Sequence, residues 1–140
     1  MKLNLESYRD KVYACWIGKN IGGTIGTPFE GRRELLDVQG FATEPGKPLA
    51  NDDLDLQVLW LDVAEKYGAD FTSFDLLKRF CEYCDYNPGE YAIMRKNYNR
   101  GIYPPLSGKF CNDFYTTGMG CPIRSEIWAC LSPLSPERAA

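Results

Sequence analysis

The sequence predicts an all-α protein, and three features lead to that prediction. Apolar residues recur at helical spacing in several segments, and typical helix-start and helix-end residues flank those segments. No segment of any length alternates apolar and polar residues as a half-exposed strand does. The chain has 140 residues, 44% of them hydrophobic, which suits one domain or part of one with a real core.

The expected helices can be ordered along the chain by their periodicity. They cover residues 5–25, 52–67, 72–84, 90–100, 122–131 and 136 onward. Gly68 and Gly101 directly follow two of these segments, as C-cap glycines do, and Thr72 or Ser73 provides the N-cap of the third. Pro136 falls in the first turn of the last segment, where proline is tolerated.

Glycines form a stripe on the first expected helix. Gly18, Gly22 and Gly26 are spaced four residues apart, and each costs about 1 kcal/mol relative to alanine inside a helix. Such a stripe needs a reason, and two remain open at this point. Either another helix packs closely against it, or a ligand approaches the backbone there.

Composition excludes several functional classes. The net charge is −3, without the basic surplus that nucleic-acid or anionic-membrane binding requires. The start of the sequence lacks an apolar signal-peptide core, and no apolar run is long enough to span a membrane. We therefore expect a cytoplasmic protein. In that compartment the six cysteines are expected to be reduced, buried thiols rather than disulfides or a zinc site.

The absence of histidine narrows the chemistry further. The chain has no histidine, which is the commonest general base and transition-metal ligand. Acid–base or metal chemistry must therefore rest on carboxylates, which favour magnesium, manganese or calcium.

Three aspartates crowd the start of the second expected helix. Asp52, Asp53 and Asp55 head a segment that is apolar on nearly every face, so we expect this helix to be buried all round. Acidic residues there can simply complement the helix dipole, each contributing about 0.3–1 kcal/mol. However, partly buried carboxylates about 4 Å apart repel by roughly 4 kcal/mol per pair, and a divalent cation would relieve that repulsion. Both interpretations stay open.

Helix geometry limits which of these acids can act together. Asp52 and Asp55 lie one turn apart on the same face, whereas Asp53 lies about 100° round the helix. Asn51 occupies the cap position and can add a side-chain oxygen. Water and other protein ligands would have to complete an octahedral site.

Several motifs together resemble one known family. The glycine-striped helix ends in GTPFE (Gly26 to Glu30), NDD heads an apolar helix, and GMGCPIR follows later. In this order they resemble the ADP-ribosylglycohydrolase family, which includes the dinitrogenase-reductase-activating glycohydrolase. The resemblance spans the whole chain and is more specific than any single motif.

The resemblance implies a fold, an activity and cofactors. The family fold is an all-α orthogonal helical bundle with a pair of Mg²⁺ or Mn²⁺ ions at the base of an ADP-ribose cleft. Its members are hydrolases that cleave the glycosidic bond between ADP-ribose and a protein side chain, or related ADP-ribosyl compounds. The expected partner is therefore an ADP-ribosylated protein or small ADP-ribosyl compound.

The resemblance also implies roles for particular residues. The family's T-D-D-T/S motif reads Asn51, Asp52, Asp53 and Leu54 here. The first three would bind metal, Asp53 would also be catalytic, and Leu54 replaces a hydroxyl residue. Glu30 matches a glutamate that helps to organise the cleft and the attacking water, although it can equally be a solvated loop acid.

A second family motif, G-N-G-x-x-M-R, corresponds to residues 118–124. Gly118, Gly120 and Arg124 match it and would bind substrate, whereas Met119 and Ile123 depart from it. Backbone amides in such a loop can approach phosphate or ribose oxygens. Arg124 can equally be a structural ion-pair partner.

The family's second acidic cluster has no counterpart in these residues. We therefore expect residues 1–140 to be the N-terminal portion of a single domain, inactive alone, with exposed apolar faces that favour self-association or a C-terminal partner segment. Two other classes remain open: a non-catalytic module that binds ADP-ribose or a nucleotide, and a purely structural module.

Overall fold

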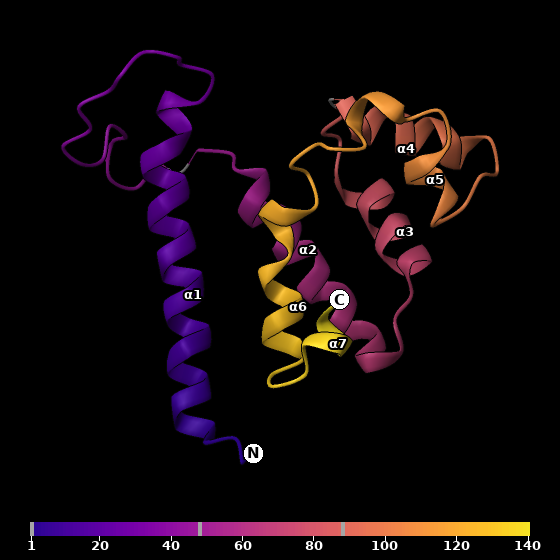
Figure 1. The fold of residues 1–140 in the computed structure, drawn as a ribbon, viewed down its shortest axis with the longest axis horizontal. Coiled ribbons are helices and arrows are strands. Elements are labelled where there is room, and N and C mark those ends of the chain that lie inside the picture. Colours follow the sequence, from indigo (N-terminus) through magenta and orange to yellow (C-terminus); the bar gives the residue numbers. More distant parts are fainter. Residues whose placement is uncertain (1, 48, 88) are drawn as a thin grey trace. The chain divides into compact units, whose positions relative to one another are not determined.

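A computed structural model describes residues 2–47, 49–87 and 89–140 (Figure 1). Within these residues all regular structure is helical, which confirms the all-α prediction. The α-helices are α1 (Leu5–Gly26), α2 (Asp52–Tyr67), α3 (Ser73–Tyr83), α4 (Gly89–Asn99), α5 (Leu106–Lys109), α6 (Glu126–Leu131) and α7 (Pro136–Ala139). The 3-10 turns are η1 (Thr27–Phe29), η2 (Gly68–Asp70), η3 (Asp113–Tyr115) and η4 (Pro122–Arg124).

The chain divides into two compact units, each described here by itself. Unit 1 contains the residues up to 55 together with residues 126–140, and unit 2 contains residues 56–125. Helix α2 begins in unit 1 and continues into unit 2. The expectation that the chain forms part of a single domain stays a prediction.

In unit 1, two side-chain contacts join α1 to α6. The Tyr8 hydroxyl donates a hydrogen bond to the Cys130 carbonyl at 2.5 Å, and Lys19 Nζ lies 2.8 Å from Glu126 Oε1. Asn4 caps the start of α1, since its Oδ1 accepts from the Ser7 N–H at 2.9 Å. Ile127 on α6 is a buried apolar residue of this unit.

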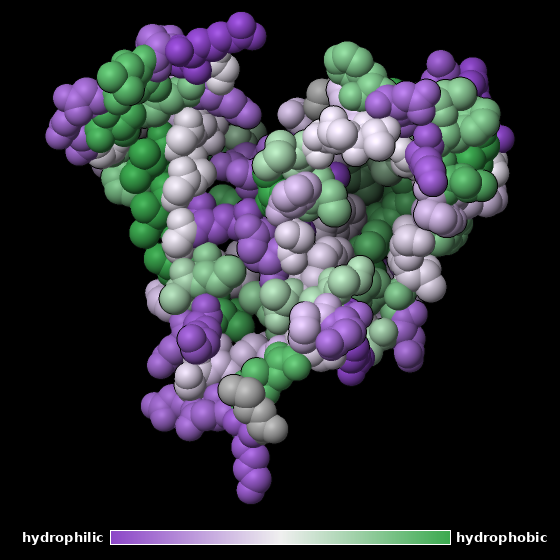
Figure 2. All heavy atoms as spheres, viewed as in Figure 1, coloured by the Kyte–Doolittle hydropathy of each residue, from purple (hydrophilic) through white to green (hydrophobic). Residues whose placement is uncertain are grey.

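Helix α1 exposes much of its apolar surface. No α1 residue is fully buried, and Ile17 and Ile21 are 42% and 46% exposed. Figure 2 shows hydrophobic residues exposed along α1. The glycine stripe is equally open: a methyl group added to Gly18, Gly22 or Gly26 would meet no atom within 4 Å in the described part of the chain. The close packing considered for this stripe is therefore not found within these residues.

Unit 2 has an apolar core built from three helices. Leu56 and Val63 of α2, Leu77 and Phe80 of α3, and Tyr91 of α4 are buried. The Phe80 and Tyr91 rings stack with centroids 5.4 Å apart. At the start of α3, Thr72 and Asp75 form a reciprocal capping box, which confirms Thr72 rather than Ser73 as the cap.

The expectation that α2 is buried all round is wrong. Leu56, Trp60 and Val63 form a buried stripe at helical spacing, but Val58 is 58% exposed. A stripe of this kind is the part of a helix that its neighbours can cover, and residues pointing elsewhere remain in solvent. Leu61 is likewise exposed.

The expected helix over residues 122–131 is interrupted. Residues 122–124 form the 3-10 turn η4, and α6 begins only at Glu126. The Ser125 N–H and hydroxyl both donate to the Pro122 carbonyl, at 3.3 and 2.9 Å. These local bonds offer the backbone an alternative to the α-helical ladder, so the turn tightens there.

The cysteines are free thiols but are less buried than expected. Cys15, Cys81, Cys84 and Cys130 are half-buried, and Cys111 and Cys121 are exposed. The exposed pair lies in the irregular stretch between α5 and α6, where the backbone runs over the surface. No helix among the described residues is long and apolar enough to cross a membrane.

Candidate functional site

The aspartate pair lies at the N-terminus of α2, where Asn51 organises the backbone. Asn51 Oδ1 accepts a hydrogen bond from the Asp53 N–H at 3.0 Å, as a helix-capping residue does. The Asp55 carboxylate accepts from the Asn51 N–H at 3.2 Å. Asp55 therefore acts as a backbone cap, while Asp52 and Asp53 are half-buried and remain the candidate ligands.

Asn51 also ties this helix start to the end of α1. Its Nδ2 donates to Thr27 Oγ1 at 3.3 Å, and the Thr27 hydroxyl donates to the Gly23 carbonyl at 2.7 Å. A methyl group on Gly23 would overlap the Asn51 side-chain nitrogen. Gly23 is therefore the α1 glycine at which the close approach of Asn51 leaves no room for a side chain. It does not belong to the stripe of Gly18, Gly22 and Gly26.

Two further charged residues share the surroundings of Asp53. Burial raises the pKa of the Asp53 carboxyl above its ordinary value; the Lys19 ammonium opposes this rise, and the charges of Asp52 and Glu126 add to it. Lys19 is itself joined to Glu126 at 2.8 Å. Unit 1 thus brings three carboxylates and one ammonium group into electrostatic contact.

The residues around Asp53 match a hard divalent cation in charge and chemistry. Three carboxylates and one ammonium group leave an excess of negative charge, and the carboxylates offer oxygen ligands, which Mg²⁺ and Mn²⁺ prefer. They form only part of a ligand set, because no group of three or more cysteine, aspartate or glutamate side chains in the described residues is arranged to hold a metal.

Glu30 lies just beyond the 3-10 turn that follows α1. Its backbone N–H donates to the Thr27 carbonyl at 3.3 Å, and its side chain is exposed. Among the described residues the structure shows no hydrogen bond or ion pair to its carboxylate. Thr27 thus links the Glu30 backbone and the Asn51 side chain to one turn.

In unit 2, the glycine-loop residues line a common pocket of about 290 Å³. Gly118, Gly120 and Arg124 all contribute to its wall. The other lining residues are Glu90, Tyr91, Met94, Gly108, Asn112, Tyr115, Thr116 and Cys121. The structure therefore brings the three predicted substrate-binding residues together.

Arg124 is held in this pocket by an aromatic residue. Its Nη1 donates a hydrogen bond to the Tyr91 hydroxyl, and its guanidinium carbon lies 4.8 Å from the Tyr91 ring centroid. Gly120 is buried, and a methyl group there would overlap Glu90 Oε1 and come within 3.2 Å of Arg124 Nη2. Glu90 and Arg124 thus both reach over the α-carbon of Gly120.

Comparison with known proteins decides the family. The sequence profile of the ADP-ribosylglycohydrolases matches residues 4–140. The chain belongs to the ADP-ribosylglycohydrolase family. This membership confirms the resemblance and indicates a hydrolase of the ADP-ribosylglycohydrolase type that acts on ADP-ribosylated substrates. No curated protein and no solved structure matches the chain.

In this ADP-ribosylglycohydrolase, the predicted site residues fall into two groups. Asn51, Asp52 and Asp53 lie in unit 1 with Glu30, whereas the glycine loop lies in unit 2. Sequence reasoning missed Lys19 and Glu126 beside Asp53, and it missed Glu90 and Asn112 beside the glycine loop. These residues belong to other segments of the chain, and no local spacing connects them to the motifs.

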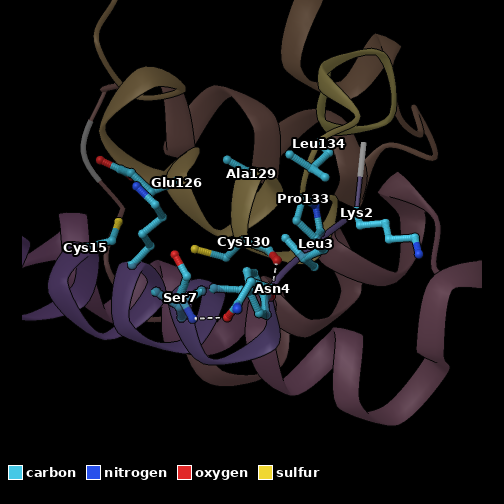
Figure 3. A pocket seen from close by; sticks show the side chains of 13 residues that line it. Lys2, Leu3, Asn4, Ser7, Cys15, Glu126, Ala129, Cys130, Pro133 and Leu134 are labelled. Atoms are coloured by element: carbon cyan, nitrogen blue, oxygen red, sulfur yellow. Dashed lines mark hydrogen bonds between the residues drawn. The ribbon is translucent and has the colours of Figure 1, made fainter.

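A second, larger pocket lies in unit 1 of this ADP-ribosylglycohydrolase, between the start of α1 and the region of α6 (Figure 3). Its volume is about 560 Å³, and apolar residues such as Leu3, Val12 and Leu134 contribute to its lining. None of the predicted site residues lines it.

Proposed function

We propose that this ADP-ribosylglycohydrolase cleaves the glycosidic bond between ADP-ribose and a protein side chain or related ADP-ribosyl compound. The observation that carries the proposal is the half-buried pair Asp52–Asp53, held at the N-terminus of α2 by the Asn51 cap. The charge of Asp52 adds to the rise in the Asp53 pKa, and a bound divalent cation would relieve that repulsion. Family membership over residues 4–140 supports the same activity.

In this proposal Asp52, Asp53 and the Asn51 oxygen would hold Mg²⁺ or Mn²⁺. When bound, such an ion supplies Lewis-acid activation of the ribose and of the attacking water. Asp53 and Glu30 would orient that water and move its proton, since a carboxylate can serve as a general base. Lys19 would limit the negative charge around Asp53, because its ammonium opposes the rise in the Asp53 pKa.

The glycine loop would bind the nucleotide part of the substrate. The exposed backbone of Gly118 can approach phosphate or ribose oxygens, since glycine has no side chain in the way, and Gly120 would leave room for Glu90 and Arg124 beside the same ligand. Arg124, oriented by Tyr91, would supply positive charge to the same ligand.

Substitution of the aspartates tests the proposed activity. Asp52→Asn and Asp53→Asn in the complete protein are expected to abolish release of ADP-ribose from ADP-ribosylated proteins, measured by chromatography in Mg²⁺ buffer. Asp55→Asn removes the same charge from the same helical turn and is expected to retain activity, because Asp55 caps the backbone. Undiminished release by Asp52→Asn would contradict the proposal.

A non-catalytic ADP-ribose-binding module is the second candidate. Leu54 favours a non-catalytic module, because it replaces the hydroxyl residue of the family motif and is half-buried beside the aspartates. Calorimetric binding of ADP-ribose by a wild-type protein that releases none from any substrate would identify this class. A melting temperature unchanged by both Mg²⁺ and ADP-ribose would indicate a structural module instead.

A further inference from the structure

Asn112 has a side chain that is fixed in one orientation and almost completely buried. It lies just before η3 and is 7% exposed. Its Nδ2 donates a hydrogen bond to the Gly108 carbonyl at 2.7 Å. Rotating the amide by 180° would set its oxygen against that carbonyl, so the hydrogen bond determines which atom points away from Gly108.

The atom that points away is an acceptor without a partner. Asn112 Oδ1 is inaccessible to bulk solvent, and no donor among the described residues reaches it. Buried polar atoms are nearly always hydrogen-bonded, and an exception in a pocket marks a place where a ligand donor can bind. Asn112 lines the same pocket as Gly118 and Gly120.

The other residues of the pocket indicate what kind of ligand would donate a hydrogen bond to Asn112 Oδ1. Glu90 adds a carboxylate, a second acceptor, and Tyr115 adds an aromatic ring. Arg124 Nη1 is already engaged with the Tyr91 hydroxyl. Two acceptors on the wall suit a ligand with neighbouring hydroxyl groups, and a volume of about 290 Å³ suits a single sugar ring rather than a whole dinucleotide.

We propose that Asn112 Oδ1 and the Glu90 carboxylate bind hydroxyl groups of a ribose, which makes Asn112 a specificity-determining residue of this pocket. The identity of the sugar rests on the proposed function, because ribose is the sugar of ADP-ribose. The Asn112 acceptor itself, and its place in the pocket beside Glu90, follow from the structure of unit 2 alone.

Calorimetry on the complete protein with ADP-ribose tests the proposal. Asn112→Leu removes the acceptor and is expected to weaken ADP-ribose binding by about tenfold or more. Asn99→Leu, at an exposed asparagine that does not line the pocket, is the matched control and is expected to bind as the wild type does. Equal affinities of Asn112→Leu and wild type would overturn the proposal.

A second measurement avoids the risk that Asn112→Leu disturbs the Gly108 contact. In the wild-type protein, saturating ADP-ribose is expected to shift the side-chain amide NMR signal of Asn112 but not that of Asn99. An unshifted Asn112 signal, or no ADP-ribose binding at all, would overturn the proposal. Inosine diphosphate ribose lacks the adenine amine; if it leaves the Asn112 signal unshifted while ADP-ribose shifts it, the donor is that amine and the ribose assignment is wrong.

The outcomes for this pocket and for the proposed hydrolysis can be separated. If wild type releases ADP-ribose from substrates but the Asn112 signal does not respond, the pocket assignment fails and the function stands. If ADP-ribose shifts the Asn112 signal but no substrate is hydrolysed, the function fails and the pocket assignment stands.

Discussion

Lys19 Nζ lies 2.8 Å from Glu126 Oε1 and joins the middle of α1 to the first turn of α6. The Lys19 side chain is only 15% exposed, so this ion pair is partly shielded from solvent. The same ammonium group acts on Asp53, whose pKa it lowers against the effect of burial. One lysine therefore both connects two helices and offsets part of the charge at the candidate metal-binding residues.

Lys19→Met is expected to destabilise the protein. It keeps most of the side-chain length but removes the ion pair with Glu126, at a cost of about 1 kcal/mol, because Glu126 is itself 39% exposed. Urea unfolding measures the change. Lys47→Met, which breaks the exposed Lys47–Glu44 pair, is the control and is expected to change stability little. Equal losses of unfolding free energy in the two variants would show that the Lys19–Glu126 ion pair stabilises the protein no more than the exposed Lys47–Glu44 pair does.

Alanine is expected to change the stability of the protein differently at two glycines of α1. Gly18 has open space around it, so Gly18→Ala should stabilise the helix by about 1 kcal/mol through helix propensity. Gly23→Ala should be destabilising relative to Gly18→Ala, because its methyl group displaces Asn51 from Thr27. Thermal unfolding of the two variants measures the difference. If Gly23→Ala stabilises as much as Gly18→Ala, the Asn51 contact is not formed.

The capping box of α3 predicts a pH-dependent stability. Hydrogen bonds from the Thr72 hydroxyl and N–H lower the pKa of Asp75 below its ordinary value of 3.8. A lowered pKa in the folded state means that this contribution is present above pH 3.8 and is lost as the pH falls through the folded-state pKa. Asp75→Asn should therefore be less stable than wild type at neutral pH, with the difference shrinking in acid.

Denaturant unfolding at several pH values tests this dependence. Asp85→Asn, at an exposed aspartate outside the capping box, is the matched control and should show no comparable trend. A stability difference between wild type and Asp75→Asn that stays constant from neutral to acidic pH would contradict the role of the Asp75 carboxylate.

Gly120→Ala is expected to weaken ligand binding more than folding. Its methyl group would overlap Glu90 Oε1, the end of a flexible side chain that can move away at small cost. The displaced carboxylate would no longer offer its acceptor in the pocket, so ADP-ribose affinity should fall several-fold while the melting temperature changes little. Calorimetry and thermal unfolding together test this, and unchanged affinity would indicate that Glu90 is not part of the binding surface.

Local signals made most of the secondary structure predictable. Thr72 and Asp75 lie three residues apart and form the capping box of α3. Gly68 directly after α2 and Gly101 two residues beyond α4 take positive φ angles of 67° and 80°. Each of these features depends on neighbours in the sequence. One exception also has a local cause, since the two hydrogen bonds that Ser125 donates to the Pro122 carbonyl interrupt the expected helix.

Contacts between distant segments were not predictable in the same way. Glu126 lies far along the chain from Lys19 and Asp53, and only folding brings these charges together. Likewise, Gly23 can be distinguished from the other α1 glycines only through its contact with Asn51. The family motifs identified Asp52, Asp53 and the glycine loop, and their predicted roles in metal and substrate binding stay predictions.

Metal binding by the Asp52–Asp53 pair is the central claim, and a Mn²⁺ titration followed by electron paramagnetic resonance tests it most directly. Wild type and Asp55→Asn are expected to remove Mn²⁺ from solution with similar affinity, whereas Asp53→Asn should bind it about tenfold more weakly or worse. A wild-type protein that leaves all Mn²⁺ free, or an Asp53→Asn variant that binds it equally well, would contradict the account.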